Sequence, residues 1–586
     1  MGRAFAEIVS RDLITVPGVY AVPPSRLQTL DAALGKRPVE APGVSSDRPA
    51  ALALGADRLG YGEYWQSQGK LEARLTIEEV PGGTMRVAEV SATDLLSAGD
   101  ALAGGVFGRA SHYETRDEMA IKDYALGVEA GDPGAAARYL SSAIAADADF
   151  EPPYAALAQL KLQQRDTAGA AAVLEQALSH RDRMPELERT QLAFDSAGLR
   201  ADAAARQQAL EAWTRLTPND PLAWRSAAET AMSRHEYNRS VAAYQKALAI
   251  QPDDGAFLNQ LGYAAAHAGD LPAAVRALER YQALRPADPN PLDSLGDVNL
   301  LAGRPKEAEN FYLQVAKKAP DFLGGGDFRK AAMARLMSGD VEGATELEKQ
   351  YLDLRAAAHD PLVDYYRVEW EWITGKRKEA YQRLEAFAHA NAGGPLKAVA
   401  LEAYGELAVW SVALGDRSAA LEAAERAGAS QIAAIARFVA QPSASPGEWQ
   451  SRAAHVFPEP AQKQLKETAL VYALLSDRQF AAAWSILKTM YEAGSGGPEE
   501  IPFLLAWCEV ETGRADEAAG LLRFSPVPAS SGVHPFQVFY FPRLFYLRGR
   551  IAMLAGQADA ARAHFQLFRR ISGDTPLIWG EEAQAH

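Results

Sequence analysis

The sequence is short of the residues that most often build covalent or metal-held sites. It has one cysteine, Cys508, in 586 residues, so it can form neither an internal disulfide nor a zinc site made of several thiolates. Its ten histidines are scattered, and none has another histidine three or four residues further on, a spacing that metal sites on helices commonly use. We therefore expect no metal and no cofactor, and we interpret Cys508 as a small apolar core residue.

Signatures of catalysis and of membrane insertion are missing as well. There is no Gly-x4-Gly-Lys-Ser/Thr loop, no Gly-x-Ser-x-Gly elbow and no His-Glu-x-x-His helix. No window approaches the ~18–20 apolar residues of a membrane span, and the formal net charge of −15 disfavours binding to phosphate backbones. We predict a non-enzymatic chain that does not itself insert into a membrane. We expect it to bind protein or peptide partners, neutral or cationic, and no nucleic acid.

What the sequence does contain is a repeat of 34 residues. Four prolines follow one another at this interval: Pro218, Pro252, Pro286 and Pro320. Leu261-Gly262 also recurs 34 residues later, as Leu295-Gly296. Apolar residues within each interval recur at a period near 3.6, which predicts two amphipathic helices per unit. Small residues followed by large ones, such as Ala274 and Leu278, predict that the two helices of a unit approach closely.

Glycines mark the expected turn between the two helices of each unit. They stand at Gly269, Gly303, Gly339, Gly375, Gly415, Gly513 and Gly556. A glycine at the end of a helix readily adopts the left-handed conformation that closes it, and a proline further on stops the second helix from continuing. The pattern predicts an array of helical hairpins.

These residues resemble the tetratricopeptide repeat (TPR) family, whose units carry Trp/Leu/Gly/Tyr in the first helix and Ala/Phe/Ala/Pro in the second. The resemblance is regular from Pro153 to Pro320, degenerate from Leu323 to Val527, and clear again through Gly556, Ala561 and Phe565. It implies a mainly α fold, a right-handed superhelix of about a dozen antiparallel helix pairs between Glu118 and Ser572. Longer connections are expected at Gln441–Phe457, Ser495–Pro498 and Ser525–His534.

The first hundred residues have a different period and predict a small α/β domain. Apolar residues alternate in short runs, which indicates strands at Val19–Val22, Arg58–Gln66, Lys70–Val80 and Met85–Ser91. Turns are expected at Gln68-Gly69 and Pro81–Gly83, and a loop at Pro38–Asp47. Helices are expected at Phe5–Leu13, Pro24–Leu34, Arg48–Leu54 and Asp94–Phe107.

The run Gly55–Val90 in this region resembles the TolB amino-terminal-like domain. That domain precedes TPR arrays in bacterial regulators, including CadC-type transcription factors, some adenylate cyclases and some serine/threonine kinases. The family's domain opens with a strand before its first helix, whereas this chain begins at the helix, so we expect either a fragment or a start placed late. The resemblance implies the outer side of the inner membrane, with the cytoplasm as the alternative. The domains expected are 1–112, 113–322, 323–527 and 528–586.

In the TPR family the first helices line a concave face, which gives a candidate ligand groove. Taking Trp224, Leu258 and Leu292 as equivalent packing positions, the groove residues lie one and five positions further on. They are Arg225, Glu229, Asn259, Tyr263, Asp293 and Asp297. The carboxylate clamp of some family members needs Lys and Asn here, and only Asn259 fits. Asp293 and Asp297, one turn apart, would suit a peptide bearing Lys or Arg; the alternative is a solvated helix face.

A second candidate surface is the aromatic run Phe536–Phe541. Its side chains Phe536, Phe539 and Phe541 could form an exposed docking patch, or they could be the core of the last unit. The favoured function is a non-catalytic scaffold or sensory module of a bacterial regulatory system. The alternative is an accessory subunit that presents substrate to a catalytic partner enzyme.

Overall fold

The computed structural model describes residues 2–13, 16, 19–21, 56–79, 85–108, 115–164, 166–200, 202–458, 462–494, 500–522, 536–573 and 575–581. They form two compact units, residues 1–231 with 239–260 (unit 1) and residues 232–238 with 261–586 (unit 2). Six of the sequence predictions lie outside the described residues: Pro24–Leu34, Pro38–Asp47, Arg48–Leu54, Pro81–Gly83, Ser495–Pro498 and Ser525–His534.

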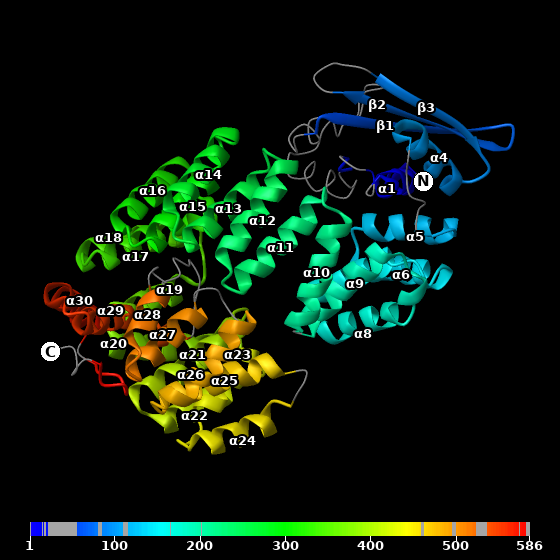
Figure 1. The fold of residues 1–586 in the computed structure, drawn as a ribbon. Helices are drawn as coiled ribbons and strands as arrows, with labels where there is room; N and C mark the ends of the chain where they lie inside the picture. Colours follow the sequence, from blue (N-terminus) through cyan, green and yellow to red (C-terminus); the bar gives the residue numbers. More distant parts are fainter. Residues whose placement is uncertain are drawn as a thin grey trace. The chain divides into compact units, whose positions relative to one another are not determined.

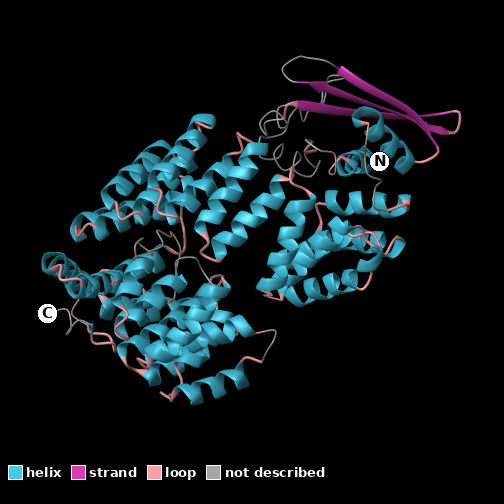
Figure 2. Ribbon diagram, viewed as in Figure 1, coloured by secondary structure: helices cyan, strands magenta, loops and turns pink. Residues whose placement is uncertain are grey.

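Unit 1 begins with the predicted α/β region. Its strands are β1 (Arg58–Ser67), β2 (Lys70–Glu79) and β3 (Met85–Ala92), an antiparallel sheet in the order β1-β2-β3 (Figure 2). Gln68 and Gly69 both have positive φ, at 52° and 78°, and form the predicted turn between β1 and β2. Alternate residues of β2 are buried against α1 (Gly2–Asp12) and α4 (Leu95–Phe107): Leu71, Ala73, Leu75 and Ile77. The alternation in the sequence thus selects the face that packs.

One predicted strand is wrong in the part that the structure describes. Residues Val19–Ala21 are not in a strand. Val19 instead donates its backbone N–H to the carbonyl of Val16 at 3.1 Å, which makes a turn after α1. The apolar run alone could not distinguish a strand from a buried turn, because both place aliphatic side chains against a core.

The rest of the chain is a TPR-like helical solenoid, as predicted (Figure 1). Its first eight helices are α5 (Glu118–Glu129), α6 (Pro133–Ala146), α7 (Pro152–Gln163), α8 (Thr167–Leu178), α9 (Glu186–Leu199), α10 (Ala203–Leu216), α11 (Pro221–Ser233) and α12 (Tyr237–Ile250). The next are α13 (Gly255–His267), α14 (Leu271–Leu284), α15 (Asn290–Leu301), α16 (Pro305–Lys318), α17 (Gly326–Met337), α18 (Val341–Ala357), α19 (Val363–Ile373), α20 (Arg377–Asn391) and α21 (Lys397–Leu414).

The array ends with α22 (Arg417–Arg426), α23 (Gln431–Val439), α24 (Pro446–Val456), α25 (Lys463–Ser476), α26 (Phe480–Ala493), α27 (Glu500–Glu511), α28 (Ala515–Leu521), α29 (Arg543–Leu554) and α30 (Ala558–Ser572). Short 3-10 helices lie at η1 (Arg181–Arg183), η2 (Phe322–Gly325) and η3 (Gln537–Phe539). Within the described ranges, no helix has the length and apolarity that crossing a membrane requires.

The glycines between paired helices confirm the predicted turn. All seven have a positive φ, between 73° and 92°. His235, which stands 34 residues before Gly269, also has a positive φ of 60°. The left-handed conformation is therefore the repeated feature, and it persists where a side chain makes it less favourable.

A second set of glycines lets the helices of a pair approach closely. A Cβ added to Gly262 in α13 would lie 2.8 Å from Leu278 in α14, and one on Gly296 would lie closer still to the ring of Tyr312. Both large side chains are fully buried, at 0% exposure. In both helix pairs, a large side chain of the second helix therefore packs directly against the backbone of the first helix.

The connection predicted at Gln441–Phe457 is wrong, because it contains helix α24. Ser445 accepts from the backbone N–H of Glu448, while the Glu448 carboxylate accepts from the backbone N–H of Ser445 at 2.8 Å. This capping box begins a helix within a segment whose Pro and Ser content indicated a loop. Pro446 fits because the first helical position needs no N–H.

The close packing at Gly296 predicts that a larger residue at this position lowers the stability of the protein. Gly296→Ala should destabilise unit 2 by about 1–2 kcal/mol, because forced overpacking outweighs the gain of helix propensity. Gly520→Ala is the control, since no atom lies within 4 Å of its added Cβ, and it should be neutral or mildly stabilising. Denaturant unfolding followed by circular dichroism measures both, and equal behaviour of the two variants would contradict the packing argument.

Candidate functional site

A simple register locates the candidate groove along the whole array. Asp270 is the N-cap of α14, and the predicted groove residues Asn259 and Tyr263 stand eleven and seven residues before it. The N-caps of the other second helices extend the same register in both directions. We call these positions the first-helix face: Ile121, Ala125, Ala155, Gln159, Gln191, Asp195, Arg225, Glu229, Asn259, Tyr263, Asp293, Asp297, Arg329, Met333, Tyr365, Glu369, Gly405, Val409, Thr468, Tyr472, Phe503, Trp507, Tyr546 and Arg550.

The α/β domain covers the beginning of this face. Ile121 and Ala125 of α5 are buried in one core together with Phe5 of α1 and Leu102 of α4. Arg11 at the end of α1 reaches further, donating to the carboxylate of Glu188 at 2.8 Å and to Gln191 at 3.3 Å. The domain is therefore fixed to α5 by apolar packing and to α9 by hydrogen bonds.

Between α7 and α9 the first-helix face contains a pocket of ≈190 Å³. Gln159 and Asp195 contribute exposed polar side chains to it. The other lining residues are Ala155, Ala158, Leu162, Leu174, Phe194, Gly198, Leu199 and Arg206. The guanidinium carbon of Arg206 lies 4.6 Å from the centre of the Phe194 ring, so this cation is stacked on an aromatic wall.

Asp195 is the acidic group of this pocket. Loss of solvation raises the pKa of its carboxyl to about 6, and the neighbouring Arg206 only partly opposes the effect. Asp195 is exposed as a residue, and it lines the pocket between α7 and α9. Its negative charge is therefore under-compensated in the free protein.

Arg225 and Glu229 of α11 complete the accessible part of the face in unit 1. Arg225 Nε lies 3.5 Å from Glu229 Oε1, and about half of each side chain is exposed, 47% and 54%. An exposed ion pair one turn apart contributes little to stability. These two residues remain available to a ligand, whereas Asn259 is half-buried.

In unit 2 the predicted acidic pair already binds a cation of the chain itself, which corrects its interpretation as an open site for a cation. Lys330 of α17 donates to Asp293 at 2.6 Å and to Asp297 at 3.1 Å. Tyr263 and Tyr312 donate their hydroxyls to Asp297 at 2.6 and 2.8 Å. Asp293 is only 5% exposed, so the pair is part of an internal network.

Asp327 adds a third carboxyl group beside this network. Burial and the nearby Asp293 carboxylate raise the pKa of Asp327 to about 8, so it is protonated at neutral pH. Sequence reasoning missed both Lys330 and Asp327. The spacing between N-caps changes here from 34 to 36 residues, from Arg304 to Asp340. The register then selects Arg329 and Met333 on α17, and Lys330 stands one position after Arg329, so the register alone does not identify it.

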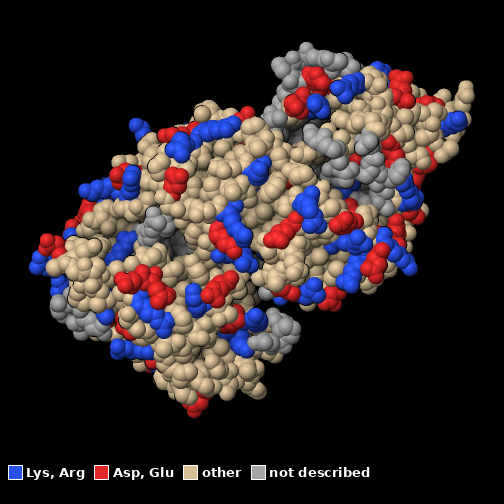
Figure 3. All heavy atoms as spheres, in the orientation of Figure 1, with Lys and Arg blue, Asp and Glu red and all other residues tan. Residues whose placement is uncertain are grey.

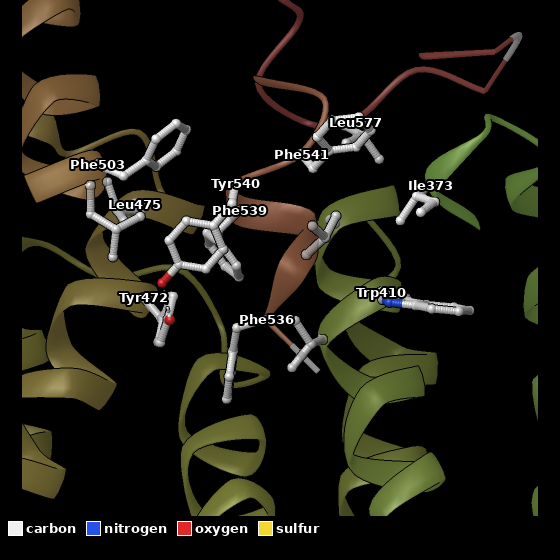
Figure 4. Close-up of a cluster of buried hydrophobic side chains, with 14 of the residues drawn as sticks. Ile373, Trp410, Tyr472, Leu475, Phe503, Phe536, Phe539, Tyr540, Phe541 and Leu577 are labelled. Atoms are coloured by element: carbon white, nitrogen blue, oxygen red, sulfur yellow. Dashed lines mark hydrogen bonds between the residues drawn. The ribbon is translucent and has the colours of Figure 1, made fainter. Parts of the chain in front are cut away.

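Toward the C-terminus the first-helix face is filled by the chain itself. Phe536, Phe539 and Phe541 are buried, at 6%, 0% and 2% exposure, so they form core and no exposed docking patch. Phe536 stacks on Tyr472 of α25 with ring centres 4.4 Å apart, and Tyr540 lies 5.4 Å from Phe503 of α27. Figure 4 shows these rings meeting between helices of unit 2.

Charges on the surface are mixed in sign. Figure 3 shows Lys and Arg interspersed with Asp and Glu on the face in view, with no extended region of one sign. On this face, recognition of a charged ligand would therefore depend on individual side chains more than on a broad field.

Comparisons with known proteins find similarity to solved structures, TPR proteins among them. No family model matches the chain, and no curated protein sequence matches it. YrrB, described as a TPR protein with an unusual peptide-binding site, is 15% identical at a TM-score of 0.26 and covers 32% of this chain and 95% of its own. A thermophilic TPR protein of Thermus thermophilus is 17% identical at a TM-score of 0.26, covering 32% of this chain and 99% of its own.

The human IFIT1 dimer with PPP-AAAA matches a longer part of the chain. It is 14% identical at a TM-score of 0.30 and covers 69% of this chain and 89% of its own. Likenesses at these TM-scores carry no argument about function. The solenoid is established by the chain's own helix pairs.

The Lys330 network predicts a large effect of removing one charge. Lys330→Gln should cost about 3 kcal/mol of stability, because two carboxylates would then lie inside without their cation. Asp293→Asn in the same chain should recover part of the loss. Lys349→Gln breaks an exposed pair with Asp353 and should leave the unfolding curve unchanged. A Lys330 variant as stable as the control would contradict the network.

The raised pKa of Asp195 predicts that removing its charge increases stability in a pH-dependent way. Its folded-state pKa of about 6 lies above the usual value of an aspartate, so the folded state binds a proton that the unfolded state has released between about pH 4 and pH 6. The charge therefore lowers stability as pH rises through that range. Asp195→Asn should stabilise unit 1 at pH 7 and give no gain at pH 4.

Asp182→Asn serves as the control for this measurement, since the Asp182 side chain is 95% exposed. It should show no pH-dependent difference from the native chain. Thermal unfolding at pH 4, 5, 6 and 7 makes the comparison, and a flat difference for Asp195→Asn would show that its charge is already compensated.

Proposed function

We propose that this chain is a protein- or peptide-binding scaffold whose ligand binds the first-helix face of unit 1, from α7 to α11. The observation that carries the proposal is the pocket between α7 and α9, with the under-compensated carboxylate of Asp195 at its wall. It is the stretch of the face where polar side chains are exposed beside a cavity. At α5 the face is covered by the α/β domain, at α15 its two aspartates bind Lys330, and at α25 and α27 it contacts the segment at 536–541.

The chemistry of the pocket favours a basic side chain with an apolar stem, as in lysine. A cation beside Asp195 would supply the compensation that Arg206 supplies only in part. Leu162, Leu174 and Phe194 would contact the methylene groups of that stem. The negative net charge would speed the approach of a basic partner.

We also propose that the scaffold is a sensory module of a bacterial regulatory system. Support comes from the resemblance of Gly55–Val90 to the domain that precedes TPR arrays in such regulators. The packing of the α/β domain also fits, because Arg11 of α1 contacts Gln191, which lies one helical turn before Asp195. A ligand in the pocket would then lie next to the domain that relays its presence.

Selection of peptides from a displayed random library on the full chain tests the binding proposal. We expect recovered peptides to share a Lys or Arg next to apolar residues. Asp195→Lys should weaken their binding at least tenfold, about 1.4 kcal/mol, because it replaces attraction by repulsion. Asp182→Lys changes the net charge equally, away from the face, and should bind like the native chain.

The affinities are measured by titration calorimetry at pH 7.5. Binding by the native chain should weaken as the pH falls below about 6, where Asp195 becomes protonated. Peptides that bind native chain and Asp195→Lys equally well would place the ligand elsewhere and overturn the proposal.

A further inference from the structure

The segment that follows the last helix is bound inside unit 2. Beyond α30 the chain leaves the helical array, and residues 575–581 lie against the helices of other pairs. Leu577, Trp579 and Glu581 are 7%, 2% and 3% exposed, whereas Pro576 faces solvent. Figure 4 shows Leu577 above the cluster formed by the aromatic segment.

Hydrogen bonds from three different helices hold this segment. The backbone N–H of Ile578 donates to the carbonyl of Ala413 in α21 at 2.9 Å. The indole N–H of Trp579 donates to the carbonyl of Leu475 in α25, also at 2.9 Å. Arg377 of α20, itself 2% exposed, donates to the carbonyl of Thr575. Backbone groups and side chains of the segment are both recognised, as in a bound peptide.

Arg543 of α29 is the centre of the recognition. Its guanidinium carbon lies 3.6 Å from the ring centre of Trp507 and 4.2 Å from that of Trp579, so the cation is held between two indoles. The same group forms an ion pair with the carboxylate of Glu581. Arg543 is 1% exposed, and a guanidinium in such surroundings requires the carboxylate partner.

Trp507 belongs to the first-helix face, which connects this site with the groove register. Its ring centre lies 5.4 Å from that of Trp579. The segment therefore occupies the surface that first helices would offer to a ligand. It is joined to α30 through Gly573, whose φ is +67°, and it belongs to no helix pair.

We infer that residues 575–581 are an intrachain ligand of the first-helix face in unit 2. The surface takes a segment with an apolar residue, a tryptophan two positions on and a glutamate two positions further. An external segment with this pattern binds the same surface when the chain's own segment is released. This site lies in the other unit and does not depend on the proposed function of the Asp195 pocket.

Binding of the segment in trans tests the inference. The full chain carrying Trp579→Ala and Glu581→Gln has a weakened internal ligand. It is titrated with a labelled synthetic peptide of residues 573–581 that ends in an amide. We expect this variant to bind the peptide at least tenfold more tightly than the native chain, whose site is occupied. Pro576→Ala, altered at an exposed position, should behave like the native chain.

Two further variants define the specificity of the site. The peptide with alanine in place of its tryptophan should not bind, and Arg543→Gln added to the weakened chain should abolish binding of the native peptide. A weakened chain that keeps its helical circular dichroism but fails to bind the peptide would overturn the inference.

If the weakened variant does not fold, hydrogen exchange in the native chain tests the same inference. The amide of Ile578 should exchange faster than the interior amides of α25, through release of the segment alone. Exchange of Ile578 only together with α25 would show that the segment is a permanent part of the core, and would also overturn the inference.

Discussion

The structure depends on the close packing of a large side chain of one helix against the backbone of the helix paired with it. Leu278 lies against Gly262 and Tyr312 against Gly296, which fixes how each first helix is rotated relative to its second helix. That rotation decides which residues of the first helix are left for a neighbour, a ligand or solvent. The register of the first-helix face, counted from the N-cap of each second helix, is a direct consequence.

The same face has different occupants along the chain. At α5 it is covered by the α/β domain, and between α7 and α11 it is accessible and carries Asp195. Around α15 its aspartates Asp293 and Asp297 bind Lys330. At α25 the face contacts Phe536 of the aromatic segment 536–541. A repeated scaffold thus keeps one register of positions while the side chains at those positions set local chemistry.

Local signals in the sequence predicted the local structure well. The 34-residue period gave the helix pairs, and the glycines between them have the left-handed conformation that their positions predicted. Contacts between distant segments could not be predicted in the same way. Lys330 pairs with Asp293 from a position one residue outside the register. The enclosure of Trp579 by α25, α27 and α29 depends on the packed array itself. The capping box at Ser445 could have been recognised in the sequence, but the Pro and Ser content of the segment led to the prediction of a connection instead.

We propose that the ligand contacts the first-helix face of unit 1. A photo-crosslinking residue placed at Gln159, which is exposed on that face, tests it most directly. The same residue at Glu175, exposed on the second helix α8, is the matched position. Capture of a selected basic peptide from position 159 and not from 175 is the result predicted here. Capture from 175 with none from 159 would contradict it.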